Sequence, residues 1–167
     1  PASHALAAAC DADIDAEGGI PTRNPEELLE VLTLLTWSAS AMSEANLAVP
    51  PAVSHAITRI APALRALRHA DGELARFHGG GKAAEGRLDQ ALAAAGVRAG
   101  ATPAIAMGYA RLQGGRTSII VDASAPPGGR AAQTAHASTT GFELTSGRRP
   151  LVVNCGSGVA VGQAWRQ

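Results

Sequence analysis

Aromatic residues are scarce in this sequence, and lysine is almost absent. Phe, Trp and Tyr make up 3% of the 167 residues, and Lys82 is the single lysine beside thirteen arginines. The apolar fraction is nonetheless 46%, much of it alanine. Because alanine buries little area, such a core gains little free energy per residue. The composition favours a globular segment that packs against structure outside this chain.

The sequence also lacks runs of like charge, long apolar runs and closely spaced cysteines. Acidic and basic residues number 14 each, and this zero net charge disfavours nucleic acid as a partner. No stretch approaches the roughly eighteen apolar residues of a membrane span, and no signal peptide opens the chain. Cys10 and Cys155 lie far apart, which leaves a disulfide open but favours free thiols. We expect no membrane span, no metal site and no cofactor.

The first seventy residues carry helical patterns. Residues 1–15 resemble the end of a helix. Asn24 then precedes Pro25 and two glutamates, which predicts an N-cap with Glu27 reaching back to close a capping box. This helix is expected to continue to about Asn46. A second helix should begin at Pro50-Pro51, and together the two should form an antiparallel hairpin.

The second of these helices has a regular apolar seam. Its members recur at intervals of three and four residues and are Val53, Ile57, Ile60, Leu64 and Leu67. This spacing places them on one helix face. Pro62 is expected to kink the helix, because its ring blocks a backbone hydrogen bond.

After residue 70 the pattern changes to short strands and turns. We expect a strand at 73–78, a short helix at 83–95 closed by Gly96, and two antiparallel hairpins. The strands of these hairpins are predicted at 106–112 with 116–122, and at 140–145 with 150–154. The fold class predicted is therefore α+β, with a helical hairpin in residues 1–70 and antiparallel β-structure in 71–167.

Few residues suggest chemistry on their own. Among the five histidines, His136 is the most interesting, because it precedes a strand among small polar residues, where imidazole can act as a base or a metal ligand. Arg148 and Arg149, with Arg130, suggest either a local anion contact or a solvated turn. Phosphate loops, nucleophile elbows and suitably spaced carboxylate pairs are missing from the sequence.

Four stretches together resemble the bacterial heparinase II/III-like proteins, which are polysaccharide lyases. The stretches are residues 17–26, 68–81, 135–144 and 147–156, with the sequences EGGIPTRNPE, RHADGELARFHGGG, AHASTTGFEL and GRRPLVVNCG. The resemblance implies that residues 1–70 are the last helices of an α/α toroid, and that 71–167 open an antiparallel β-sandwich. It also implies a fragment whose parent cleaves uronate-containing polysaccharide by β-elimination.

The same resemblance implies roles for particular residues. Family members carry an HxHxD motif, in which the first histidine looks catalytic and the second, with an Asp on the next strand, helps to hold a structural metal. Here Thr134 stands at the first histidine, His136 at the second, Ser138 at the Asp of the motif, and Asn154 near the other Asp. Hydroxyl and amide oxygens bind zinc poorly, so no metal site is expected.

His136 is therefore the candidate catalytic residue, and Arg23 and Asn24 are the candidate substrate contacts. The alternative is that His136 and Arg23 are structural, in a non-catalytic carbohydrate-binding or cell-envelope protein that keeps the fold. In either case the partner implied for the parent is an acidic polysaccharide, and the fragment itself is expected to be inactive. Exposed apolar faces also suggest self-association. The resemblance implies a bacterial source and leaves periplasm and cytoplasm open.

Overall fold

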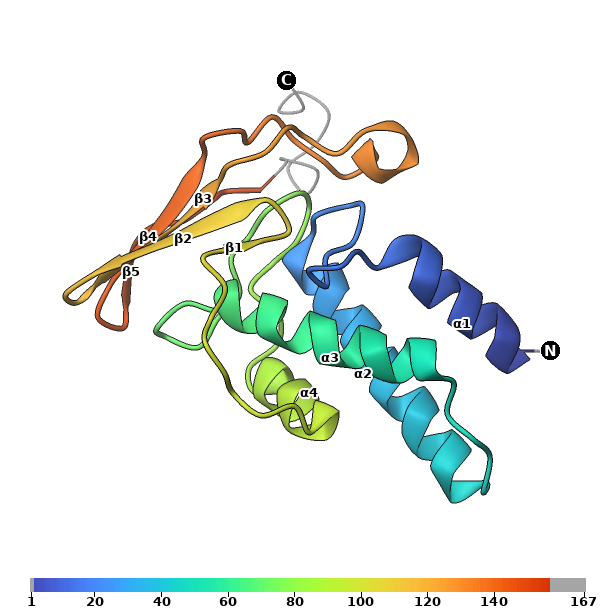
Figure 1. The fold of residues 1–167 in the computed structure, drawn as a ribbon. Coiled ribbons are helices and arrows are strands. Elements are labelled where there is room, and N and C mark those ends of the chain that lie inside the picture. The colour runs from blue at the N-terminus through green and yellow to red at the C-terminus, as the bar shows by residue number, and fades with distance from the viewer. Residues whose placement is uncertain (1, 157–167) are drawn as a thin grey trace.

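The computed structural model describes residues 2–156 and separates helices from strands (Figure 1). In chain order the elements are α1 (Ala2–Asp13), α2 (Pro25–Glu44), α3 (Pro51–Ala66), α4 (Arg87–Ala95), β1 (Ile105–Ala106), β2 (Tyr109–Gly114), β3 (Thr117–Asp122), the 3-10 helix η1 (Gly129–Ala132), β4 (Phe142–Ser146) and β5 (Arg149–Val152). This architecture confirms the predicted α+β class. That the helices end a toroid remains a proposal.

Helix α2 begins where the sequence predicts. Asn24 Oδ1 accepts hydrogen bonds from the backbone N–H groups of Glu26 and Glu27, at 3.0 and 3.2 Å. The reciprocal bond expected from Glu27 is not among the hydrogen bonds of the described residues. Glu26 instead accepts from the N–H of Gly81 at 2.7 Å, which ties the start of α2 to a loop that follows α3.

Two further helices, α1 and α4, pack beside the pair formed by α2 and α3. Helix α3 runs through Pro62 without ending, and its seam residues Val53, Ile60 and Leu64 are fully buried. Helix α1 packs against α3, and α4 packs against α2. The pair therefore has neighbours within the chain, although α2 still exposes Leu34 and Trp37, which are 52% and 66% exposed.

The strands form one antiparallel sheet in the order β1-β2-β3-β4-β5, so every neighbour in sequence is a neighbour in space. Residues on β3 alternate between buried and half-buried, as expected for a sheet with one covered face. The inner face places Tyr109, Ile120, Asp122 and Glu143 toward the helices. The outer face is apolar and partly exposed, with Leu112, Ile119, Leu144 and Val152 in register across four strands.

Three local predictions are wrong. The segment 73–78 is a buried loop with one isolated bridge rather than a strand, because residues buried next to each other break the alternation and His78 has a positive φ of 48°. The strand predicted at 106–112 is interrupted by a turn at Met107-Gly108, where both residues have positive φ. The helix predicted from 83 begins at Arg87, since Gly86 is left-handed with φ 76°.

The sheet is fastened directly to the end of α3. Arg111 on β2 donates hydrogen bonds from Nη1 to the carbonyl oxygens of Ala66 and Arg68, at 3.0 and 2.7 Å. Carbonyl groups at a helix C-terminus lack partners within the helix, and a cation there is also attracted to the negative end of the helix dipole. One continuous core includes residues of α2, α3, α4, β2 and β3. A domain boundary at residue 70 remains a prediction.

A search of residues 2–156 finds no helix with the length and hydropathy needed to cross a membrane. Cys10 is buried and Cys155 is exposed, and both are free thiols.

Candidate functional site at the junction of helices and sheet

Arg23 lies in the loop before α2 and reaches into the sheet. Its Nε and Nη1 donate hydrogen bonds to the carbonyl oxygens of Met107 and Ala125, at 2.8 and 2.7 Å. Its Nη2 forms an ion pair with Asp122. The guanidinium also lies over the ring of Tyr109, with Cζ 4.7 Å from the ring centroid. All three guanidinium nitrogens are thus engaged within the protein.

Asp122 is the centre of this cluster, at the end of β3. Its side chain is fully buried, and it accepts a hydrogen bond from the Ser138 hydroxyl at 2.5 Å in addition to the contact with Arg23. Burial alone would raise the pKa of Asp122, but the Ser138 hydrogen bond and the Arg23 charge outweigh burial and hold this pKa below its usual value. The carboxylate is therefore ionised at neutral pH.

His78 is buried beside this carboxylate. Its Nε2 lies 3.3 Å from Asp122 Oδ2, yet neither of its ring nitrogens makes a hydrogen bond to the described residues. Burial, reinforced by the Arg23 charge, lowers the pKa of His78 to about 4 despite the opposing charge of Asp122. The ring of His136 is its neighbour, at 5.3 Å between centroids. His78 is consequently neutral at pH 7.

His136 is half-buried and paired with an amide. Its Nε2 accepts a hydrogen bond from Asn154 Nδ2 at 3.1 Å. The amide orientation follows from Asn154 Oδ1, which accepts from the N–H of Gly156 at 2.9 Å. Burial lowers the pKa of His136, with Asp122 opposing the shift. The ring is neutral at pH 7, but the lone pair that a general base would use is occupied.

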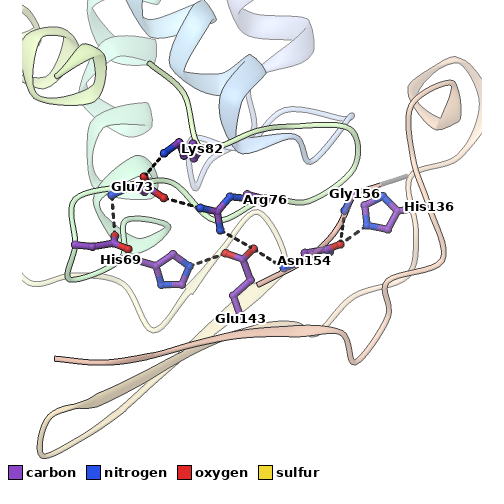
Figure 2. A network of polar contacts seen from close by, with 9 residues as sticks. His69, Glu73, Arg76, Lys82, His136, Glu143, Asn154 and Gly156 are labelled. Atoms are coloured by element: carbon purple, nitrogen blue, oxygen red, sulfur yellow. Dashed lines mark hydrogen bonds and ion pairs between the residues drawn. The ribbon is translucent and has the colours of Figure 1, made fainter. Parts of the chain in front are cut away.

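Glu143 organises a second polar network next to His136 (Figure 2). Its carboxylate is fully buried on β4 and accepts hydrogen bonds from His69 Nε2 at 2.7 Å and from the Asn154 N–H at 2.8 Å. Arg76 completes the charge balance, with Nη1 3.6 Å from Glu143 Oε1. The buried carboxylate therefore fixes the backbone at Asn154, and through the Asn154 side chain it positions His136.

The network continues outward to a solvent-facing ion pair. Glu73 bonds to Arg76 at 2.5 Å and to Lys82 at 2.7 Å. Glu73 and Lys82 border a hollow of about 480 Å³ that also includes Arg148. A larger hollow, of about 620 Å³, is bordered by Asp15, Arg23 and other residues of α1, the loop before α2 and the β1–β2 turn.

The structure brings two of the three sequence-predicted site residues together. Arg23 contacts Asp122 directly through an ion pair. His136 lies one residue further away, because its ring neighbours that of His78, which lies beside the Asp122 carboxylate. Asn24 is next to Arg23 but is occupied as the cap of α2, and Gly80 approaches it so closely that a Cβ there would stand 2.3 Å from Asn24 Oδ1. Catalysis by His136 and substrate contact by Arg23 and Asn24 remain predictions.

The junction does not fit the structural metal that the family resemblance implies. Among residues 2–156, no group of three or more His, Cys, Asp or Glu side chains is placed to hold a metal ion. His136 Nε2 faces an amide N–H group, and the Ser138 hydroxyl donates to Asp122 instead of offering a free anionic oxygen. A metal ion requires ligand lone pairs that point toward it, and these groups direct theirs elsewhere.

Sequence reasoning missed the two buried carboxylates and their partners. Asp122 and Glu143 lie on predicted strands, but the sequence does not show which strand face is covered. One available signal is the alternation Phe142-Glu143-Leu144, which places a charge on the face opposite two apolar residues. His69 and Arg76 carry no local signal, because their partners lie 74 and 67 positions away in the chain.

Comparison with known proteins relates this chain to one family and to one curated protein. Residues 97–167 match the family model described as heparinase II/III-like, C-terminal. FtsZ-localized protein C of Caulobacter vibrioides (strain NA1000 / CB15N) is 35% identical over 154 residues, which cover 91% of this chain and 27% of that protein. The chain thus spans about a quarter of the length of this curated relative. No solved structure matches the chain. Through residues 97–167, the chain is thus similar to the C-terminal part of the heparinase II/III-like proteins.

Proposed function

We propose that the intact protein is a heparinase II/III-like protein of the bacterial cell envelope that binds a uronate-containing polysaccharide without cleaving it. In this proposal residues 2–156 form the junction between a helical array and a β-domain. The observation that carries it is the state of His136, whose Nε2 is occupied by the Asn154 amide. A base must offer a free lone pair to the proton that it removes.

The other groups that β-elimination needs are engaged in the same way. Neutralising a uronate carboxylate requires a free cation, and the Arg23 guanidinium is already bonded to Asp122 and two carbonyl oxygens. A tyrosine that assists the reaction needs an accessible hydroxyl. Tyr109 is buried, its hydroxyl donates to the Arg23 carbonyl oxygen at 2.5 Å, and burial raises its pKa strongly. The described residues of this junction are therefore poorly placed to catalyse β-elimination.

The relative supports a location shared with FtsZ. FtsZ-localized protein C is named for that location, and we extend it to the intact form of this protein. The exposed Leu34 and Trp37 on α2 support the further proposal that α1–α3 continue into a toroid, because apolar helix faces of this kind are normally covered by neighbours.

A second candidate is a lyase in which this segment is inactive alone but the intact protein cleaves uronate polymers by β-elimination. The match of residues 97–167 to a lyase-related family favours it. So does the lowered pKa of His136, which keeps its ring neutral at pH 7, as a general base requires.

The test uses the intact protein with a panel of uronate polymers, measuring binding by calorimetry and unsaturated uronide products by near-ultraviolet absorbance. Binding without product is the result expected. Product formation that disappears in His136→Ala but persists in His55→Ala, a matched change at an exposed helical histidine, would establish the lyase instead. Product that survives both changes also overturns the non-catalytic proposal and places the base elsewhere in the protein.

A further inference from the structure

The tips of two hairpins lie side by side at the end of the sheet farthest from η1 (Figure 1). The β2–β3 loop contains Gly115 and Arg116, and the β4–β5 loop contains Gly147 and Arg148. The Gly147 N–H donates a hydrogen bond to the Arg116 carbonyl oxygen at 2.6 Å. This backbone contact holds the two tips together as one surface.

Arg116 crosses from its own loop onto the neighbouring one. A Cβ at Gly147, whose φ is +59°, would stand 3.0 Å from Arg116 Nη2. A side chain at this position would therefore crowd the guanidinium, and glycine leaves room for it. Arg148 and Arg149 follow at once in the chain, so three arginines gather at the paired tips.

These three arginines have no ion-pair partner among the described residues. All three are exposed. The strands of the two hairpins carry two carboxylates, Asp122 and Glu143. Glu143 is buried on the inner face of the sheet and is already bonded to His69. Arg148 also borders the 480 Å³ hollow, whose carboxylates are Asp71, Glu73, Glu85 and Asp89. Glu73 and Asp89 are paired with Lys82 and Arg68, and no carboxylate of the hollow forms an ion pair with Arg148.

We propose that the paired hairpin tips bind the anionic groups of an acidic polysaccharide, with Arg116, Arg148 and Arg149 supplying the charge. The inference rests on the proposed function and adds a second contact surface outside the junction. A planar guanidinium pairs through two parallel hydrogen bonds with carboxylate or sulfate, and three of them at adjacent loops suit a chain of repeated anionic groups. Nucleic acid fits less well, because no aromatic side chain stands at the tips for base stacking.

The experiment compares the intact protein with the triple variant Arg116→Gln/Arg148→Gln/Arg149→Gln, measuring binding to heparin and to alginate oligomers. The control is Arg87→Gln/Arg98→Gln/Arg130→Gln, which changes net charge equally at arginines outside the tips. We expect the first variant to bind about tenfold to a hundredfold more weakly, with a shallower salt dependence, and the control to bind normally. Because all three tip residues are exposed, the melting temperature should not change.

Each other result has a distinct meaning. Undiminished polysaccharide binding by the tip variant overturns the inference and leaves the proposed function standing. An equal loss in the control also overturns it, because it shows nonspecific charge attraction. A loss seen with vesicles of anionic phospholipid, but not with either polysaccharide, assigns the tips to a membrane surface instead. If the unsubstituted protein binds no polysaccharide, both the inference and the proposed function fail.

Discussion

Arg23 and Asp122 form an ion pair that is almost completely buried, with side chains 11% and 0% exposed, although they lie 99 positions apart in the chain. The pair joins the loop before α2 to the end of β3. Arg23 has a positive φ of 52°, and this unusual backbone conformation is held by the contacts that its side chain and carbonyl oxygen make with the sheet.

Removing the Arg23 charge should destabilise the fold strongly. In Arg23→Met the Asp122 carboxylate stays buried without its cation, which typically costs about 3–5 kcal/mol. Denaturation in urea at pH 7 measures the change, and Arg130→Met, at an exposed arginine on η1, should stay within about 0.5 kcal/mol of the parent. The double variant Arg23→Met/Asp122→Asn should lose less than the sum of its single changes. A loss below about 1 kcal/mol in Arg23→Met would contradict the structural importance of this pair.

His78 should make the protein sensitive to mild acid. Its pKa is about 4 in the folded protein against 6.5 as the ordinary value, so the unfolded chain binds more protons between these two pH values. The stability that neutral His78 contributes is complete above pH 6.5 and is lost as the pH falls toward 4, by roughly 3 kcal/mol in total.

The free energy of unfolding, measured from pH 8 to pH 4, checks this expectation. His78→Phe should flatten the dependence in that window and leave a smaller slope from His136, whose pKa is also lowered. His55→Phe, at an exposed position, should leave the profile unchanged. An unaltered slope in His78→Phe would show that another group governs the acid sensitivity.

Asn24 has a demonstrated role as a helix cap and a predicted role as a substrate contact, and two substitutions separate them. Asn24→Ala removes the cap and should cost about 1 kcal/mol, whereas Asn24→Asp retains it and should be nearly neutral for stability. If Asn24 also contacts an acidic polysaccharide, the new charge in Asn24→Asp should weaken binding by the intact protein. Normal binding by a stable Asn24→Asp protein would remove the substrate role.

Glu143 should be the residue through which the fold controls His136. Glu143→Gln retains the shape but loses hydrogen bonds to a charged acceptor, and we expect a loss of about 2 kcal/mol in stability. It should also shift the ring resonances of His136 in NMR spectra, because the Asn154 backbone is no longer held by a carboxylate. Glu85→Gln, at an exposed residue, is the control. A stable Glu143→Gln protein with unchanged His136 resonances would disprove this linkage.

Local signals in the sequence predicted much of the secondary structure. The Asn24 cap, the α3 seam and the hairpin turns near Gly115 and Gly147 each depend on residues a few positions apart, and all occur in the structure. The segment 73–78 failed because Phe77 and His78 are buried next to each other. No strand that alternates between two faces can bury adjacent side chains on one of them.

The candidate site could be predicted only in part, because it is built from distant pairs. The resemblance directed attention to His136 and Arg23, but their surroundings depend on Asp122 and Glu143, whose burial is decided by how the sheet meets the helices. The sequence shows the substitutions Thr134, Ser138 and Asn154. It does not show that the Ser138 hydroxyl donates a hydrogen bond to Asp122, or that the Asn154 amide donates one to His136 Nε2.

The hydrogen bonds from Arg111 to the end of α3 and the residues that follow it bear on how the protein can be divided. Expression of residues 1–70 alone would leave the carbonyl groups of Ala66 and Arg68 without this guanidinium and would uncover apolar side chains of α3. The isolated helices would then be prone to fraying and aggregation. The two halves should instead melt in a single calorimetric transition, as one cooperative unit.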